Sequence, residues 1–173
     1  MDTQQVDDIE KRVQEAITEG AEAAAAAHGG NPEFTVAIKE SLTRLGKKLG
    51  YRVCTTLPNI ADYPEWLWDL TWVRGGDKAG VFELSDMPLA VESEWKEDFG
   101  KEILPDFQKL MVARAWLRVM VFQAPNAEVK MRFDQLREAI RTYSGTQPGD
   151  RYLFACWNYD PAVWAMQFEG HVA

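Results

Sequence analysis

The chain has 173 residues, of which 46% are hydrophobic and 27% are charged, a composition typical of a single globular domain with a hydrophobic core. Its formal net charge of -8 argues against a protein that coats nucleic acid through bulk positive charge. An enzyme with a local basic groove would still be consistent with this charge. No apolar run reaches the length of a membrane span and the acidic N-terminus is no signal peptide, so we expect a cytoplasmic protein without membrane contact.

Residues 3–27 have the pattern of an amphipathic helix that ends at Gly29-Gly30. Apolar residues recur along it at a spacing of three to four: Val6, Ile9, Val13, Ala16 and Ile17. We expect residues 1–30 to form an N-terminal extension, either an appendage or an arm through which two copies form a homodimer. Residues 31–173 are then a single α/β domain.

Helix and strand patterns alternate through the rest of the chain. A helix is expected over residues 32–49, followed by strands at 51–57, 65–73 and 89–96, with a turn at 74–77 and a possible extension of that hairpin at 81–84. A helix at 99–112 (or from Pro105 onward), a strand at 115–122, a helix at 128–143 and strands at 152–157 and 163–168 complete the pattern. Three consecutive strands predict an antiparallel meander, and the next strand–helix–strand step predicts a parallel crossover. The expected fold is a mixed β-sheet flanked by helices.

The third strand of this set, Leu89–Lys96, carries an unusual charge pattern. It opens with apolar residues and then places Glu92, Glu94 and Lys96 on one face, because successive strand side chains point to opposite faces. Two carboxylates at this spacing repel each other, and Mg²⁺ or Mn²⁺ would convert that repulsion into coordination. The alternative is a solvent-facing edge strand whose charges discourage aggregation.

Asp69 lies among apolar residues in the second strand, in the segment Trp66-Leu67-Trp68-Asp69-Leu70-Thr71-Trp72. Burial of a carboxylate costs several kcal/mol unless it is paired or bound to a metal. If the second and third strands are neighbours, the acids of the third strand are the nearest polar groups. The alternative for Asp69 is a hydrogen-bonded acid at a strand end or a salt bridge to an arginine.

These elements and residues together resemble the PD-(D/E)XK nuclease superfamily over about residues 32–123. That family combines a helix, a three-stranded meander, a crossover helix and a further strand, with an acid on the second strand and an acid-x-lysine on the third. Asp69 matches the first acid and Glu94-Trp95-Lys96 matches the second element. A second register, Glu92-Ser93-Glu94, matches the E-x-E variant of some restriction enzymes, and we favour it slightly because Glu92 follows directly on the apolar run.

The resemblance implies a restriction-endonuclease-like three-layer sandwich that hydrolyses phosphodiester bonds in nucleic acid, with DNA as the expected substrate. Mg²⁺ or Mn²⁺ would be bound by Asp69, Glu92 and Glu94, and Lys96 would act on the attacking water. One alternative is a catalytically inactive member of the same fold that binds nucleic acid or a protein partner. A third hypothesis is an adaptor or immunity-type protein with an unrelated α/β sandwich.

Other positions are less informative. Glu40 is the candidate for the glutamate that many family members carry on the first helix, but it lies opposite the apolar stripe and we expect it in solvent. Gln108 matches the glutamine that some exonuclease-type members carry on the crossover helix, although Val112 replaces their tyrosine. Trp66, Trp68 and Trp72 could stack on bases, with core packing expected for most tryptophans.

Overall fold

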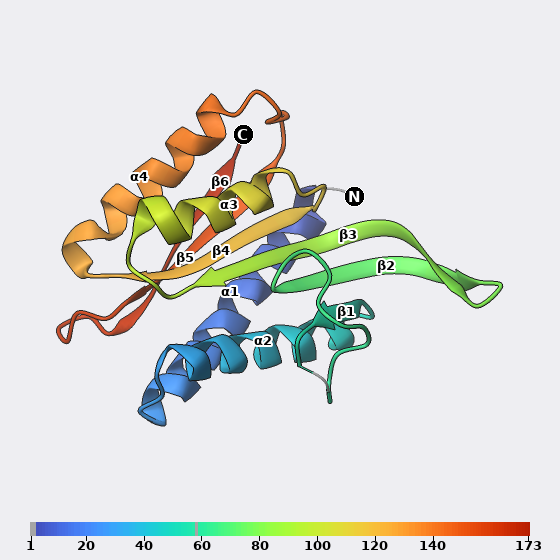
Figure 1. The fold of residues 1–173 in the computed structure, drawn as a ribbon, viewed down its shortest axis with the longest axis horizontal. Helices are drawn as coiled ribbons and strands as arrows, with labels where there is room; N and C mark the ends of the chain where they lie inside the picture. The colour runs from blue at the N-terminus through green and yellow to red at the C-terminus, as the bar shows by residue number, and fades with distance from the viewer. Residues whose placement is uncertain (1–2, 58) are drawn as a thin grey trace.

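The computed structural model describes residues 3–57 and 59–173, so residues 1 and 2 of the expected N-terminal extension lie outside the described range. A six-stranded mixed sheet is covered by helices on both faces (Figure 1). The elements are α1 (Thr3–Ala26), α2 (Asn31–Lys48), β1 (Arg52–Thr55), β2 (Leu70–Lys78), β3 (Val81–Glu94), a π-helical turn η1 (Phe99–Ile103), α3 (Leu104–Met111), β4 (Leu117–Ala124), α4 (Asn126–Thr142), β5 (Arg151–Asn158) and β6 (Ala165–Val172).

The strands follow one another across the sheet in chain order, from β1 to β6. β1, β2 and β3 form an antiparallel meander, β4 and β5 run parallel to β3, and β6 is antiparallel to β5. The helix α3 connects β3 to β4 and α4 connects β4 to β5, because parallel neighbours need a crossover. The expected α/β class, with a meander followed by a parallel crossover, is confirmed.

Two hydrophobic cores lie on the two faces of the sheet. On one face, α1 and α2 pack against side chains such as Leu89 and Val91 of β3. On the other face, η1, α3 and α4 pack against Ala90 of β3 and Phe122 of β4. The central strands are buried on both faces, which explains why β4 is almost continuously apolar.

The helix α1 is an integral layer of this fold. Ile9, Val13 and Ile17 are buried in the same core as the sheet. Gly20 lies so close to α2 that a Cβ on it would come within 2.8 Å of the carbonyl oxygen of Ala37. The apolar face of α1 is therefore used within the chain, and a homodimer through this helix stays a prediction.

The β2–β3 hairpin differs from the sequence-based expectation. The strand expected at 65–73 begins only at Leu70, and the turn expected at 74–77 lies inside β2. The turn is at Ala79 and Gly80, which both have positive φ values (52° and 80°), as two-residue hairpin turns require. Gly75 is not part of the turn. It lies where the backbones of β2 and β3 pass close together, because a Cβ there would lie 2.1 Å from the Glu83 carbonyl oxygen. The hairpin thus extends well beyond β1 (Figure 1).

None of the helices in the described residues has both the length and the apolar character of a membrane span. Cys54 and Cys156 are both free and buried.

Candidate functional site

Two of the predicted acids lie where β2 begins and β3 ends. Leu70, the first residue of β2, pairs with Val91, so Asp69 precedes this end of the ladder and Glu92 follows it on β3. Asp69 Oδ2 accepts hydrogen bonds from the backbone nitrogen of Ser93 (2.8 Å) and from its hydroxyl (3.2 Å). Asp69 is therefore tied to β3 although it precedes β2.

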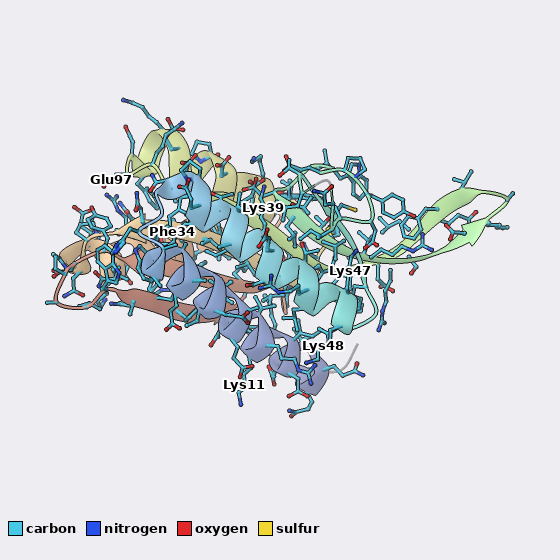
Figure 2. The ribbon with its side chains drawn as sticks, turned by 90° about the horizontal axis from the view of Figure 1, so that it is seen from below. Lys11, Phe34, Lys39, Lys47, Lys48 and Glu97 are labelled. Carbon is cyan, nitrogen blue, oxygen red and sulfur yellow. The ribbon has the colours of Figure 1, made fainter. Side chains whose placement is uncertain are left out.

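A lysine from α2 is the charged partner of Asp69. Lys39 Nζ lies 2.9 Å from Asp69 Oδ1 and 3.3 Å from Glu65 Oε2, and it also donates to the hydroxyl of Thr56. Its side chain is only 8% exposed. Figure 2 shows its place along α2, between Phe34 and Lys47. Asp69 thus has an ion pair, as one sequence-based alternative expected, but with a lysine.

Glu92 points toward the opposite helix layer. Its side chain is 4% exposed, and Lys109 Nζ on α3 lies 2.8 Å from Glu92 Oε1. This ion pair is the single polar contact of Oε1 within the described part of the chain. Lys109 also contacts Asp106 at 3.0 Å. Glu92 is therefore a buried carboxylate that is incompletely satisfied.

This environment changes the protonation of Glu92. Burial raises the pKa of Glu92 to about 8, with a further contribution from the charge of Asp69, while Lys109 lowers it in part. Burial lowers the pKa of Lys109, but its contacts with Glu92 and Asp106 outweigh this and leave the value raised. Burial is the main cause of this raised pKa, because a single ion pair with Lys109 does not replace the hydration that the Glu92 carboxylate loses in the folded chain.

The other two predicted residues lie outside this pair. Glu94 is partly exposed, and its Oε1 accepts a hydrogen bond from the backbone nitrogen of Lys96 (2.7 Å). Lys96 lies beyond the end of β3, has a side chain that is 67% exposed, and pairs with Glu102 at 3.0 Å. Asp69 and Glu92 therefore lie at the same end of the β2–β3 ladder but turn toward opposite helix layers, and Lys96 lies on the surface.

The donor set fits a magnesium-type site only in part. Within residues 3–57 and 59–173, no group of three or more His, Cys, Asp or Glu side chains is arranged to hold a metal. Mg²⁺ often uses one or two carboxylates and completes its shell with water and substrate phosphate, so a single acid of this pair could supply a ligand. However, the two side chains turn toward opposite helix layers, and each already has a lysine partner, Lys39 for Asp69 and Lys109 for Glu92.

The lysines were not predicted from the sequence. Lys39 lies three residues before the buried Leu42, and Lys109 directly precedes the buried Leu110. Lysines beside an apolar stripe usually reach solvent, so the pattern contains only a weak signal. Glu40 is 48% exposed, as expected, with Arg44 at 3.9 Å.

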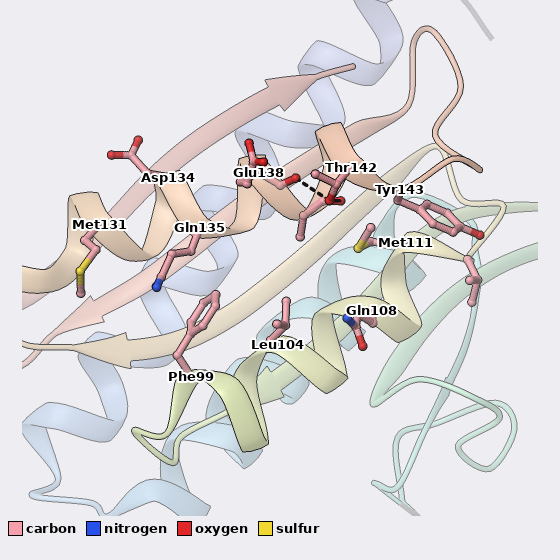
Figure 3. A pocket seen from close by; sticks show the side chains of 12 residues that line it. Phe99, Leu104, Gln108, Met111, Met131, Asp134, Gln135, Glu138, Thr142 and Tyr143 are labelled. Carbon is pink, nitrogen blue, oxygen red and sulfur yellow. Dashed lines mark hydrogen bonds between the residues drawn. The ribbon is translucent and has the colours of Figure 1, made fainter.

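Gln108 belongs to a different feature, a groove between α3 and α4 (Figure 3). The groove has a volume of about 770 Å³, and its walls include Phe99, Leu104 and Met111. Gln108 lines this groove, whereas its neighbour Lys109 reaches Glu92. The groove is therefore separate from the acidic pair.

Comparison of the chain with protein-family models, with curated proteins and with solved structures finds no match.

Proposed function

We propose that this chain is a metal-dependent phosphodiesterase of the PD-(D/E)XK type that acts on nucleic acid, with Asp69 and Glu92 as ligands of Mg²⁺ or Mn²⁺. One observation carries the proposal: Glu92, at the end of the ladder that Asp69 precedes, is an almost fully buried acid whose Oε1 has Lys109 as its single polar partner within the described residues. Such a carboxylate costs stability, and strongly perturbed acids of this kind cluster at functional sites.

The residues of the site have separable roles in this proposal. A bound metal would supply an activated water and neutralise charge on the phosphate. The amide of Ser93 and the ammonium group of Lys39 orient the carboxylate of Asp69. A phosphate bound at this strand end would have to draw Lys39 or Lys109 from its acid, and that ammonium group would then stabilise the negative charge on the phosphate. Lys96 has no role in this proposal, and Glu92, the first acid of the Glu92-Ser93-Glu94 register, is the ligand from β3.

The element order supports the finer fold assignment, which is part of the same proposal. The helix α2, the meander β1–β3, the crossover α3 and the parallel β4 follow one another as in a restriction-endonuclease-like core. DNA as substrate and a cytoplasmic location belong to the proposal as well; the two free, buried thiols suit a reducing compartment.

A second candidate is a non-catalytic member of the same fold that binds nucleic acid or a protein. The observation that favours it is that Lys39 and Lys109 already neutralise the two acids from opposite sides. In this case the lysines permanently replace a cation, and the site is structural.

Metal titration separates the two candidates. Calorimetry with Mn²⁺, followed by cleavage assays on labelled oligonucleotides, should show binding and cleavage by the wild type and neither by Asp69→Asn or Glu92→Gln. Glu40→Gln, a half-exposed glutamate, is the matched control and should behave as the wild type. If the lysines replace the cation, the wild type binds no Mn²⁺ and cleaves nothing, whereas Lys39→Met or Lys109→Met gains Mn²⁺ binding.

A further inference from the structure

We infer that the substrate is single-stranded nucleic acid and that one unpaired base stacks on Trp66, in a hollow beside the acidic pair. This inference rests on the proposed function and names the substrate class of that site. It begins with the segment Glu65–Asp69, which forms the rim of the site.

Three residues anchor this segment. Glu65 and Asp69 both contact the ammonium group of Lys39. Trp68 is only 7% exposed, and its indole nitrogen donates a hydrogen bond to the carbonyl oxygen of Lys109 (3.0 Å). The segment is therefore tied to both lysines of the candidate site.

The two residues between these anchors face solvent. Trp66 is 53% exposed and Leu67 is 61% exposed. Glu65 contacts Lys39 and directly precedes Trp66, and both residues line the same hollow. Large apolar side chains held at the rim of a site commonly contact a ligand.

Trp66 also forms a wall of a hollow of about 340 Å³ beside β1. The hollow is mostly apolar, and its lining includes Cys54, Tyr63, Pro64, Trp66, Phe82 and Leu84. Its inner wall is held together, since the rings of Tyr63 and Phe82 lie 5.4 Å apart and the guanidinium group of Arg52 lies 4.8 Å from the Phe82 ring. The hollow is at the small end of the size range of ligand pockets, which suits one planar ring system.

Charge determines which nucleic acid this surface suits. Duplex binding without base contacts depends on cations that neutralise phosphates. The net charge is -8, and two cations that lie nearby are paired with acids: Arg52 with Asp77 at 2.6 Å and Lys47 with Asp62 at 3.3 Å. A single strand carries half the phosphate charge of a duplex per unit length, so an acidic chain repels it less, and its unstacked bases can stack on an aromatic face whatever their sequence. An unpaired base of a single strand is thus the occupant that fits.

The test is binding of the full chain to a fluorescent twelve-nucleotide strand and to the same strand as a duplex, both with a chelator, so that metal binding plays no part. The wild type should prefer the single strand by at least about tenfold, and Trp66→Ala should weaken single-strand binding roughly 5- to 100-fold. Trp66→Phe should retain most of the affinity, since it keeps an aromatic face. Trp164→Ala is the matched control, because Trp164 is 52% exposed but lies between β5 and β6.

The outcomes separate this inference from the proposed function. Single-strand binding that depends on Trp66, without Mn²⁺ binding or cleavage, supports the inference and rejects the enzyme. Mn²⁺-dependent cleavage with Trp66→Ala equal to the wild type on both substrates overturns the inference and leaves the enzyme. Equal affinity for strand and duplex, or no binding of either, also overturns it.

Discussion

Replacement of Glu92 by glutamine should make the stability of the chain less dependent on pH. The side chain of Glu92 is 4% exposed, and burial raises its pKa from the ordinary 4.5 to about 8. The folded chain therefore keeps a proton that the unfolded chain releases above pH 4.5. By proton linkage, the free energy of unfolding of the wild type should fall as the pH rises from 4.5 to 8. Glutamine resembles the protonated acid and cannot lose that proton.

The size of the effect follows from the two pKa values. A rise from 4.5 to about 8 means that the folded state holds the proton roughly three thousand times more tightly, which corresponds to an upper bound of roughly 5 kcal/mol above pH 8. Lys109 contacts Glu92 directly, titrates together with it and will readjust. We therefore expect the gain in stability of Glu92→Gln over the wild type to be about 2 to 4 kcal/mol larger at pH 8.5 than at pH 5.0.

Urea unfolding followed by tryptophan fluorescence, with a chelator and at pH 5.0, 6.5 and 8.5, measures this difference. Titrating groups common to both proteins cancel in the comparison. Glu40→Gln is the control, and its stability should stay within about 0.5 kcal/mol of the wild type at each pH. A Glu92→Gln variant that loses about 3 kcal/mol or more at every pH would refute the reasoning, because Glu92 would then be a charged partner that Lys109 requires.

Four further substitutions test the packing and the pairing around the site. Asp69→Asn should lower the free energy of unfolding by about 1 to 3 kcal/mol in urea, because it weakens hydrogen bonds to a charged acceptor. Lys39→Met should cost about 3 kcal/mol with chelator, since it removes a buried cation from its acids, and Mn²⁺ should restore part of the loss in thermal melts if the site binds metal. Gly46→Ala should cost about 1 to 3 kcal/mol despite the better helix propensity of alanine, because its Cβ would lie 2.5 Å from Trp72 Nε1; unchanged stability would contradict the close packing of α2 on β2. Gly76→Ala, with nothing within 4 Å of its Cβ, should change stability by less than about 0.5 kcal/mol.

Periodicity in the sequence was sufficient to predict most of the elements. The helix pattern at 3–27 corresponds to α1, and the apolar run at 115–122 corresponds to the buried β4. Both patterns arise because a buried face repeats with the period of its own element, which is a local property. The order of these elements then restricted the sheet to a meander followed by parallel crossovers.

The tertiary structure alone decided the chemistry of the site. Alternation placed Glu92, Glu94 and Lys96 on one face, but it could not show that β3 ends at Glu94 and leaves Lys96 in solvent. Lys39 and Lys109 come from helices on opposite sides of the sheet, 30 and 17 residues from the acids that they contact. Nothing in their local patterns distinguishes them from lysines that reach water. The pairing of a buried charge depends on which side chains the packed layers bring within a few ångströms, and that is a property of the whole fold.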